Sequence, residues 1–191
     1  DRSYGSDSRR VCRLGVARVQ GLQAHGVAAC AKHFPGLGAV QRDPHKTLPT
    51  IRLDWGAMRT THLPPFEAAM AAGVAAVMSS HVCYPALGDP EGLPATFSPR
   101  LIRELLRQTM GFSGLIVTDD LLMGALRAFG RMGEIATRAV EAGHDVLLLC
   151  DDLKAQKEAF SGLVGAYRSG RLHVAELEAS VERLAVLRRK F

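Results

Sequence analysis

Four short runs of consecutive apolar residues recur along the chain, and longer stretches with helical spacing separate them. Continuous apolar runs of this length are typical of parallel strands with both faces covered, whereas strands with one wet face alternate. The runs therefore predict buried parallel strands. They lie at residues 27–31, 75–79, 115–118 and 145–150.

Helices are predicted before, between and after these strands in the sequence. One begins at Ser98, a favourable N-cap residue, with Pro99 in its first turn and Gly111 as its stop. Three of the four strands come directly after a glycine that ends a helix. The predicted helices cover residues 8–25, 65–73, 99–110, 121–127, 131–142, 153–169 and 174–189.

Strands that alternate with helices predict an α/β fold with parallel strands and right-handed crossovers. Four such units are half of a TIM-type (β/α)8 barrel, which needs about 250 residues. We expect residues 1–191 to form a single partial barrel domain, the C-terminal part of such a barrel, with its N-terminal strands missing from this chain. The alternative is a small open doubly wound sheet. Such sheets often carry a GxGxxG turn after the first strand, and this chain has only the first two of those glycines, Gly36 and Gly38.

Composition excludes several classes of protein. Hydrophobic residues make up 47% of the chain, so a packed core is expected. The net charge of +5 is scattered, and no basic stripe is interleaved with aromatics, so we expect no nucleic-acid partner. No apolar run approaches the roughly 18 residues of a membrane span, so we expect no membrane partner. The four cysteines form no CxxC pair, which favours reduced core cysteines and a cytoplasmic location.

Two adjacent acids, Asp119 and Asp120, end the third predicted strand. Side chains alternate along a strand, so the two carboxylates are expected to point to opposite sides. A carboxylate at the C-terminal end of a barrel strand is a candidate nucleophile or metal ligand. We assign the active-site role to Asp119, and we expect Asp120 to cap the helix that follows.

The loop after the first predicted strand carries most of the other ionisable groups. Asp43 and His45 are two residues apart, so the carboxylate can orient the imidazole and raise its pKa for acid/base work. An ordinary surface loop is the alternative for that pair. Lys32 can donate to a sugar hydroxyl or a phosphate. His33 is either a binding residue or a packed, hydrogen-bonded histidine.

His81 follows the second predicted strand, where it suits either the wall of a pocket or a structural role. A metal site built from His33, His45, His81 and Asp119 would lack the usual HxH or HExxH spacing. We therefore expect no metal.

Several ordered motifs resemble one enzyme family. They are KHFPGLG at residues 32–38, DPH at 43–45, MSSHVCYP at 78–85, LPATFS at 93–98 and GFSGLIVTDDLLM at 111–123, together with the opening DRSYG. In this order they resemble the family 3 glycoside hydrolases, in the branch of bacterial β-N-acetylhexosaminidases of the NagZ type. The resemblance runs from the start of the chain to about Asp152.

The resemblance implies a TIM-type barrel and a retaining β-N-acetylglucosaminidase. Asp119 matches the nucleophile of the family, and His45 with Asp43 match an acid/base dyad that replaces the usual second carboxylate. Arg2, Lys32 and His33 match sugar-contacting positions.

The same resemblance implies a terminal β-linked N-acetylglucosamine as substrate, carried by small glycosides or by the anhydro-muropeptides of peptidoglycan recycling. It implies no cofactor or metal, and we expect a monomer. The chain departs from the family at Leu37, where histidine is common, and at Pro44, where serine or threonine is common. Both changes bear on how the loop closes.

Two other functions remain open. A phosphorylase would resolve the same covalent intermediate with phosphate in place of water. A non-catalytic truncated barrel would serve as an interaction module.

Overall fold

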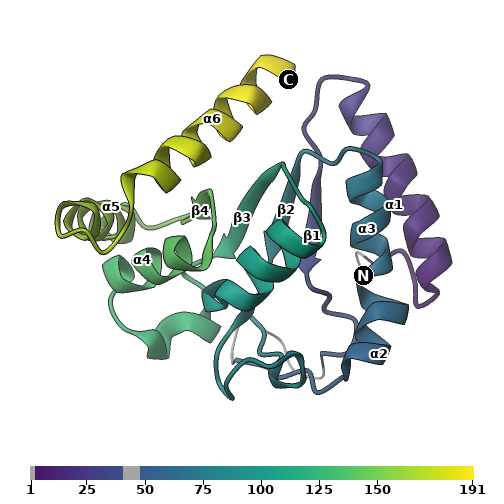
Figure 1. The fold of residues 1–191 in the computed structure, drawn as a ribbon, viewed down its shortest axis with the longest axis horizontal. Helices are drawn as coiled ribbons and strands as arrows, with labels where there is room; N and C mark the ends of the chain where they lie inside the picture. Colours follow the sequence, from purple (N-terminus) through teal and green to yellow (C-terminus); the bar gives the residue numbers. More distant parts are fainter. Residues whose placement is uncertain (1–2, 41–47) are drawn as a thin grey trace.

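A computed structural model describes residues 3–40 and 48–191. It contains one sheet of four parallel strands in the order β1-β2-β3-β4 (Figure 1). The strands are β1 (Cys30–Phe34), β2 (Ala76–Ser79), β3 (Leu115–Asp120) and β4 (Val146–Leu148). Neighbours in the sheet are also neighbours in sequence, and helices connect them. The predicted α/β class with parallel strands is thus confirmed.

The helices lie before, between and after the strands. Figure 1 shows α1 and α3 beside the β1 end of the sheet, and α4, α5 and α6 at the β4 end. They are α1 (Ser8–Gln23), α2 (Trp55–Ala57), η1 (Met58–His62), α3 (Pro64–Ala71), η2 (Pro85–Leu87), η3 (Ala95–Phe97), η4 (Arg100–Thr109), η5 (Gly124–Phe129), α4 (Met132–Ala142), α5 (Leu153–Arg168) and α6 (Val174–Lys190).

One face of the sheet is packed against helices. Val77 and Ile116 are neighbours in register and fully buried, and they share a core with side chains of α1, α3 and η4. On the other face, Lys32, Met78 and Val117 are neighbours in register, and these side chains are exposed or half-buried. The sheet therefore has a covered face and an open face. The register between β3 and β4 shifts between Val117 and Asp120, so alternation alone does not place Asp119. Burial and the nearby Asp119 carboxylate both raise the pKa of the thiol of Cys30, an exposed residue on the same face of β1 as Lys32, so Asp119 lies on the open face.

The strand boundaries differ from the prediction, most of all in β1 and β3. The second strand begins one residue later than predicted, and the fourth covers residues 146–148 instead of 145–150. The first strand begins at Cys30 instead of residue 27, and Val27 is 51% exposed. Its register with β2 starts at the pair Cys30–Ala76, so Lys32 and His33 belong to the strand and not to the following loop. The third strand continues through both acids to Asp120. Hydrogen bonding to the neighbouring strand decides where each strand begins and ends. The local hydrophobicity of the sequence does not reveal that pairing.

The helix after Ser98 confirms its predicted cap. The Ser98 hydroxyl oxygen accepts a hydrogen bond from the Leu101 amide at 3.0 Å and donates to Asp89 Oδ1 at 2.8 Å. The predicted helix over residues 121–127 is wrong. A short 3-10 helix, η5, follows there instead and begins at Gly124.

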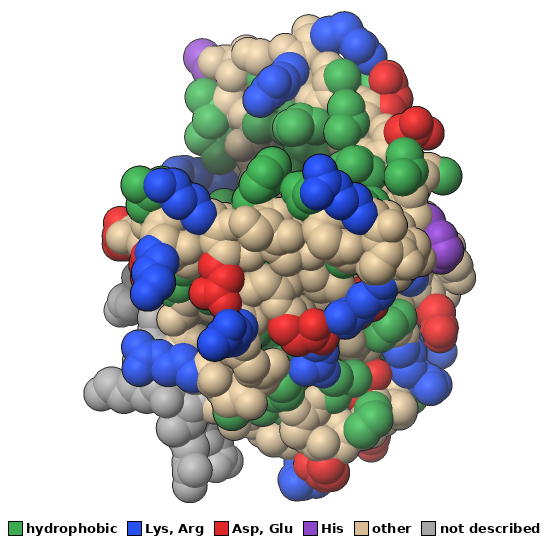
Figure 2. All heavy atoms as spheres, turned by 90° about the vertical axis from the view of Figure 1, so that its left-hand side faces the viewer, with side chains coloured by type: hydrophobic (Ala, Val, Ile, Leu, Met, Phe, Trp, Pro, Cys, Tyr) green, Lys and Arg blue, Asp and Glu red, His purple; other side chains and the backbone are tan. Residues whose placement is uncertain are grey.

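Helix α6 lies on the outside of the molecule, and none of its residues is buried. Figure 2 shows hydrophobic side chains gathered over the upper part of the molecule, where α6 lies. Val174, Leu177, Val181 and Val186 are the exposed apolar residues of that helix. In the described part of the chain, no helix has the length and apolar character needed to cross a bilayer.

Candidate active site

The carboxyl ends of the four strands meet at one edge of the sheet, and Asp119 lies there on the open face. Its Oδ1 accepts a hydrogen bond from the Asp120 amide at 2.9 Å. Its Oδ2 is 3.4 Å from Nε2 of His33, and the two side chains are 23% and 19% exposed. The carboxylate is thus held by its own backbone on one oxygen and faces an imidazole with the other.

A bulge in β1 brings His33 to Asp119. Lys32 pairs with Met78 and Phe34 with Ser79, so two steps along β1 oppose one step along β2. His33 is the extra residue at this irregularity. Bulges of this kind re-aim a side chain near functional sites. Strict alternation along β1 would place His33 on the opposite face from Lys32, and the bulge interrupts that alternation.

Lys32 is an exposed residue of β1, in register with Met78 on the open face. Across the sheet, Lys32, Met78 and Val117 form one row, and Asp119 follows Val117 along β3. An ammonium group there can reach hydroxyl or phosphate oxygens of a ligand laid across the sheet edge. The remaining candidates, Arg2, Asp43 and His45, lie outside the described residues.

Asp120 shapes the turn after β3. Its Oδ1 accepts from the Leu122 amide at 3.1 Å, and its carbonyl oxygen accepts from the Met123 amide at 3.1 Å. The expected capping of a following helix is wrong, because η5 begins beyond this turn and has no side-chain cap. Asp120 also raises the pKa of the nearby Cys150 thiol through its negative charge.

The sequence left open whether His81 forms the wall of a pocket or has a structural role, and the structure favours the structural role. It is buried, with Nδ1 2.6 Å from Thr96 Oγ1 and Nε2 2.9 Å from the carbonyl oxygen of Asp120. Thr96 is buried as well, and its Oγ1 also lies 3.1 Å from the Ser80 carbonyl oxygen. Sequence reasoning missed Thr96, since nothing local indicates that residues 81 and 96 meet.

The segment after β1 is a packed turn. Tyr84 donates its hydroxyl hydrogen to the Gly36 carbonyl oxygen at 3.1 Å, and the Ser80 amide donates to the Phe34 carbonyl at 2.9 Å. A Cβ atom at Gly36, where φ is +131°, would come within 2.7 Å of the His62 ring. Leu37 packs against the core. This geometry fixes the backbone of the segment that directly follows β1.

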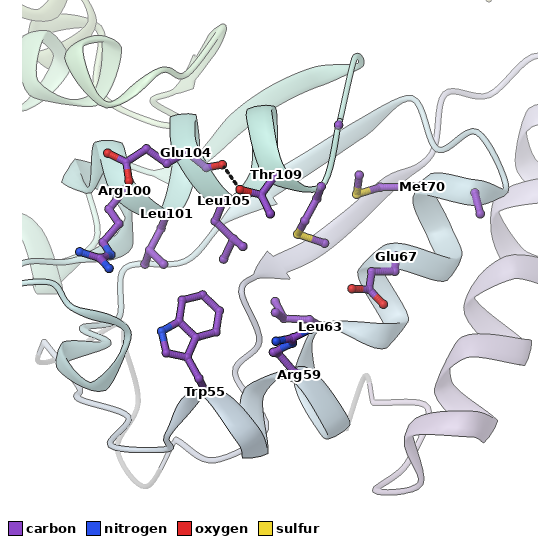
Figure 3. Close-up of a pocket in the computed structure, with 13 residues that line it drawn as sticks. Trp55, Arg59, Leu63, Glu67, Met70, Arg100, Leu101, Glu104, Leu105 and Thr109 are labelled. Carbon is purple, nitrogen blue, oxygen red and sulfur yellow. Dashed lines mark hydrogen bonds between the residues drawn. The ribbon is translucent and has the colours of Figure 1, made fainter.

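A groove of about 1030 Å³ lies elsewhere, between η1, α3 and η4 (Figure 3). Its apolar lining includes Leu63, Leu101 and Leu105, and Trp55 stands at one end. All its lining residues lie outside the four strands and the strand ends. It is therefore separate from Asp119 and His33.

The free cysteines only partly match their predicted place in the core. Cys83 is buried, Cys12 is half-buried, and Cys30 and Cys150 are exposed. Among the described residues, no group of three or more His, Cys, Asp and Glu side chains is arranged to hold a metal ion.

The chain matches known proteins over nearly all its length. A family model described as the glycosyl hydrolase family 3 N terminal domain matches residues 1–187. The beta-hexosaminidase of Hydrogenovibrio crunogenus is 38% identical over 177 residues, which are 93% of this chain and 48% of that protein. The chain spans about half the length of the curated relatives it matches.

Solved structures agree with the family match. A glycoside hydrolase family 3 beta-N-acetylglucosaminidase from Paenibacillus sp. str. FPU-7 superimposes with a TM-score of 0.96 and 44% identity, over 99% of this chain and 36% of that one. The beta-glucoside phosphorylase BglX superimposes with a TM-score of 0.91 and 27% identity, over 99% of this chain and 35% of that one. With an acid at the end of β3 and the family model covering residues 1–187, the chain belongs to glycoside hydrolase family 3.

Proposed function

We propose that this protein is a retaining β-N-acetylglucosaminidase that releases terminal β-linked N-acetylglucosamine. The observation that carries the proposal is the Asp119 carboxylate, which is half-buried at the carboxyl end of β3 and braced by the Asp120 amide. A carboxylate so placed can attack a sugar bound over the open edge of the sheet. The names of the relatives, beta-hexosaminidase and beta-N-acetylglucosaminidase, support the substrate class.

In the proposed reaction, Asp119 attacks the anomeric carbon while the bond to the leaving oxygen breaks. That oxygen takes a proton from His45, which Asp43 orients, and a covalent glycosyl ester forms on Asp119. Water then attacks the same carbon, gives a proton back to His45 and releases Asp119. The sugar keeps its configuration because it is inverted twice. The roles of His45 and Asp43 rest on the motif resemblance.

His33 and Lys32 are proposed to bind the sugar. Nε2 of His33 is 3.4 Å from Asp119 Oδ2, so its ring lies where a sugar in reach of the carboxylate would be. Lys32, on the open face of β1, would donate to sugar hydroxyls. Arg2 is assigned to the same task on its motif alone.

The biological setting is also a proposal. We propose that the enzyme acts as a monomer in the cytoplasm, on anhydro-muropeptides during peptidoglycan recycling. The motif resemblance supports the substrate, and four free cysteines are compatible with a reducing compartment.

The test is hydrolysis of 4-nitrophenyl N-acetyl-β-D-glucosaminide by the complete gene product. We expect turnover by the wild type and a loss of several orders of magnitude in Asp119→Asn, because the amide cannot form the ester. The exposed Glu178→Gln, a matched removal of one negative charge, should turn over normally. Proton NMR should show the β-anomer as the first product. Full activity in Asp119→Asn would exclude the mechanism.

Phosphorolysis is the second candidate, since the structural neighbours include a beta-glucoside phosphorylase. In that reaction phosphate, and not water, would attack the glycosyl ester and produce a sugar 1-phosphate. A rate that rises with phosphate concentration and a phosphorylated product would establish it. A folded protein that binds the sugar but turns over neither way would instead support an interaction module.

A further inference from the structure

A buried contact links the end of β2 to the residue that follows the proposed nucleophile. Nε2 of His81 is 2.9 Å from the carbonyl oxygen of Asp120, although the two residues are 39 positions apart in sequence. His81 is 1% exposed, so no solvent competes for this contact. We propose that His81 is a positioning residue, which holds the turn after β3 so that the Asp119 carboxylate keeps its reactive geometry.

The chemistry of the contact sets its direction. A peptide carbonyl oxygen can only accept a hydrogen bond, so Nε2 of His81 carries the hydrogen and donates it. At the other end of the ring, Nδ1 is 2.6 Å from Thr96 Oγ1. Thr96 is fully buried, and its hydroxyl hydrogen can be donated to this ring nitrogen, while its Oγ1 also lies 3.1 Å from the Ser80 carbonyl oxygen. The imidazole is thus braced from behind, and its donor points at β3.

The backbone of Asp120, through its carbonyl and its amide, transmits this restraint to Asp119. The carbonyl of Asp120 accepts from His81 on one side and from the Met123 amide, at 3.1 Å, on the other. The amide of the same residue donates to Asp119 Oδ1 at 2.9 Å. One residue therefore receives the bond from His81 and holds the carboxylate. Rotation of Asp120 after loss of the His81 donor would move the amide that aligns Asp119.

The inference rests on the proposed function, because positioning has meaning only if Asp119 reacts. A misplacement of about 1 Å in a reacting group costs on the order of 100-fold in rate. Removal of the donor should therefore lower the rate of attack by Asp119, and it should leave sugar binding by other residues nearly unchanged. That separation between kcat and KM distinguishes positioning from general damage.

Two substitutions at His81 separate the donor from the bulk of the ring. In His81→Gln the amide nitrogen reaches about the place of Nε2 and can still donate to the Asp120 carbonyl. In His81→Asn the amide reaches only about the place of Nδ1, so the contact with Thr96 is retained and the one with Asp120 is lost. Both variants remove a titratable ring and replace it with a neutral amide, so each is the control for the other.

The experiment measures kcat and KM of the complete gene product on 4-nitrophenyl N-acetyl-β-D-glucosaminide, with the melting temperature of each variant by circular dichroism. We expect kcat to fall ~10- to 100-fold in His81→Asn with KM within about threefold of wild type. His81→Gln should recover most of the rate. The rate of His81→Asn should also depend more steeply on the pKa of the leaving phenol, since attack by Asp119 becomes limiting.

Three outcomes would overturn the inference. One is wild-type kcat in a folded His81→Asn protein. Another is an equal loss of kcat in both folded variants, which would mean that the ring fills space and its donor is not used. If both variants fail to fold, Thr96→Val replaces them, and an unchanged kcat there would also contradict the brace. An inactive wild type, by contrast, would contradict the proposed function itself and remove the basis of the inference.

Discussion

At the scale of single residues, the candidate site depends on where a few hydrogen bonds place charged groups. Asp119 owes its orientation to the amide of the next residue and to His33 across the sheet. His144, which contacts Ser79 at the end of β2, is held by hydrogen bonds in the same way, but in its neutral form. It is buried, its Nδ1 is 2.9 Å from the Ala139 carbonyl, and its Nε2 is 2.8 Å from Ser79 Oγ. Because the carbonyl only accepts, Nδ1 carries the hydrogen and Nε2 accepts from the serine.

His144 makes stability depend on pH. Burial lowers the pKa of its imidazole to about 4, whereas an unfolded histidine titrates near pH 6.5. Between these values the unfolded chain binds more protons, so stability is full above about pH 6.5 and falls as the pH drops towards 4. We expect a loss of about 2 kcal/mol between pH 7 and pH 5 from this residue.

Urea unfolding at both pH values measures that loss. His144→Gln should flatten the pH dependence, and His173→Gln, which replaces an exposed histidine, should leave it as in the wild type. An identical pH dependence in all three proteins would show that His144 does not titrate as described.

At the scale of elements, α4 and α5 approach each other through glycines. Gly133 of α4 and Gly162 of α5 face one another. A Cβ atom at Gly162 would overlap the Cα of Gly133 and lie 2.8 Å from its carbonyl oxygen. Gly165, one turn along α5, has open space where its Cβ would be. The helix packing therefore requires a glycine at position 162 but not at position 165.

Alanine substitutions at these glycines should change stability in opposite directions. Gly162→Ala forces two backbones apart and should cost about 1–3 kcal/mol. Gly165→Ala adds no contact and stiffens the unfolded chain, so it should gain about 0.4–1 kcal/mol. Thermal unfolding followed by circular dichroism compares the two variants. Equal shifts in melting temperature would mean that the helices adjust and that the close approach is not needed.

At the scale of the whole molecule, α6 is joined to the sheet by charge. Asp145, 1% exposed at its side chain, pairs with Arg107 of η4 and with Arg183 of α6, each at 2.7 Å. It also accepts hydrogen bonds from the Ile116 amide and from Ser180 of α6. Since no residue of α6 is buried, this carboxylate and the pair of Glu176 with Arg103 of η4, also at 2.7 Å, link that helix to the body of the protein.

Asp145→Asn should loosen α6. Removal of one partner from a buried ion pair leaves the arginines uncompensated and costs about 3–5 kcal/mol. Trypsin should then cut first at the arginines of α6, before the rest of the chain. Glu182→Gln is the control, because it breaks an exposed pair with Arg189 that is worth at most ~1 kcal/mol. Tryptic resistance of Asp145→Asn equal to that of the control would rule out this attachment.

The sequence by itself determined the order and type of most elements, and it singled out Asp119 as the candidate nucleophile. Continuous apolar runs, a serine cap and terminal glycines are local signals, so they predicted parallel strands separated by helices. The ends of the strands were harder to predict from sequence. The predicted start of β1 and the predicted helix after Asp120 were wrong. The motifs also led to the family, because they retain residue types in a fixed order.

Only the tertiary structure decided which side chains meet. His33 reaches Asp119 through a bulge that exists because β1 pairs with β2. His81 reaches Asp120 because the ends of β2 and β3 lie side by side, and Thr96 braces it from a segment fifteen residues away. Such contacts depend on strand register and on chain crossings. A sequence pattern with a period of two or three and a half residues carries no information about either.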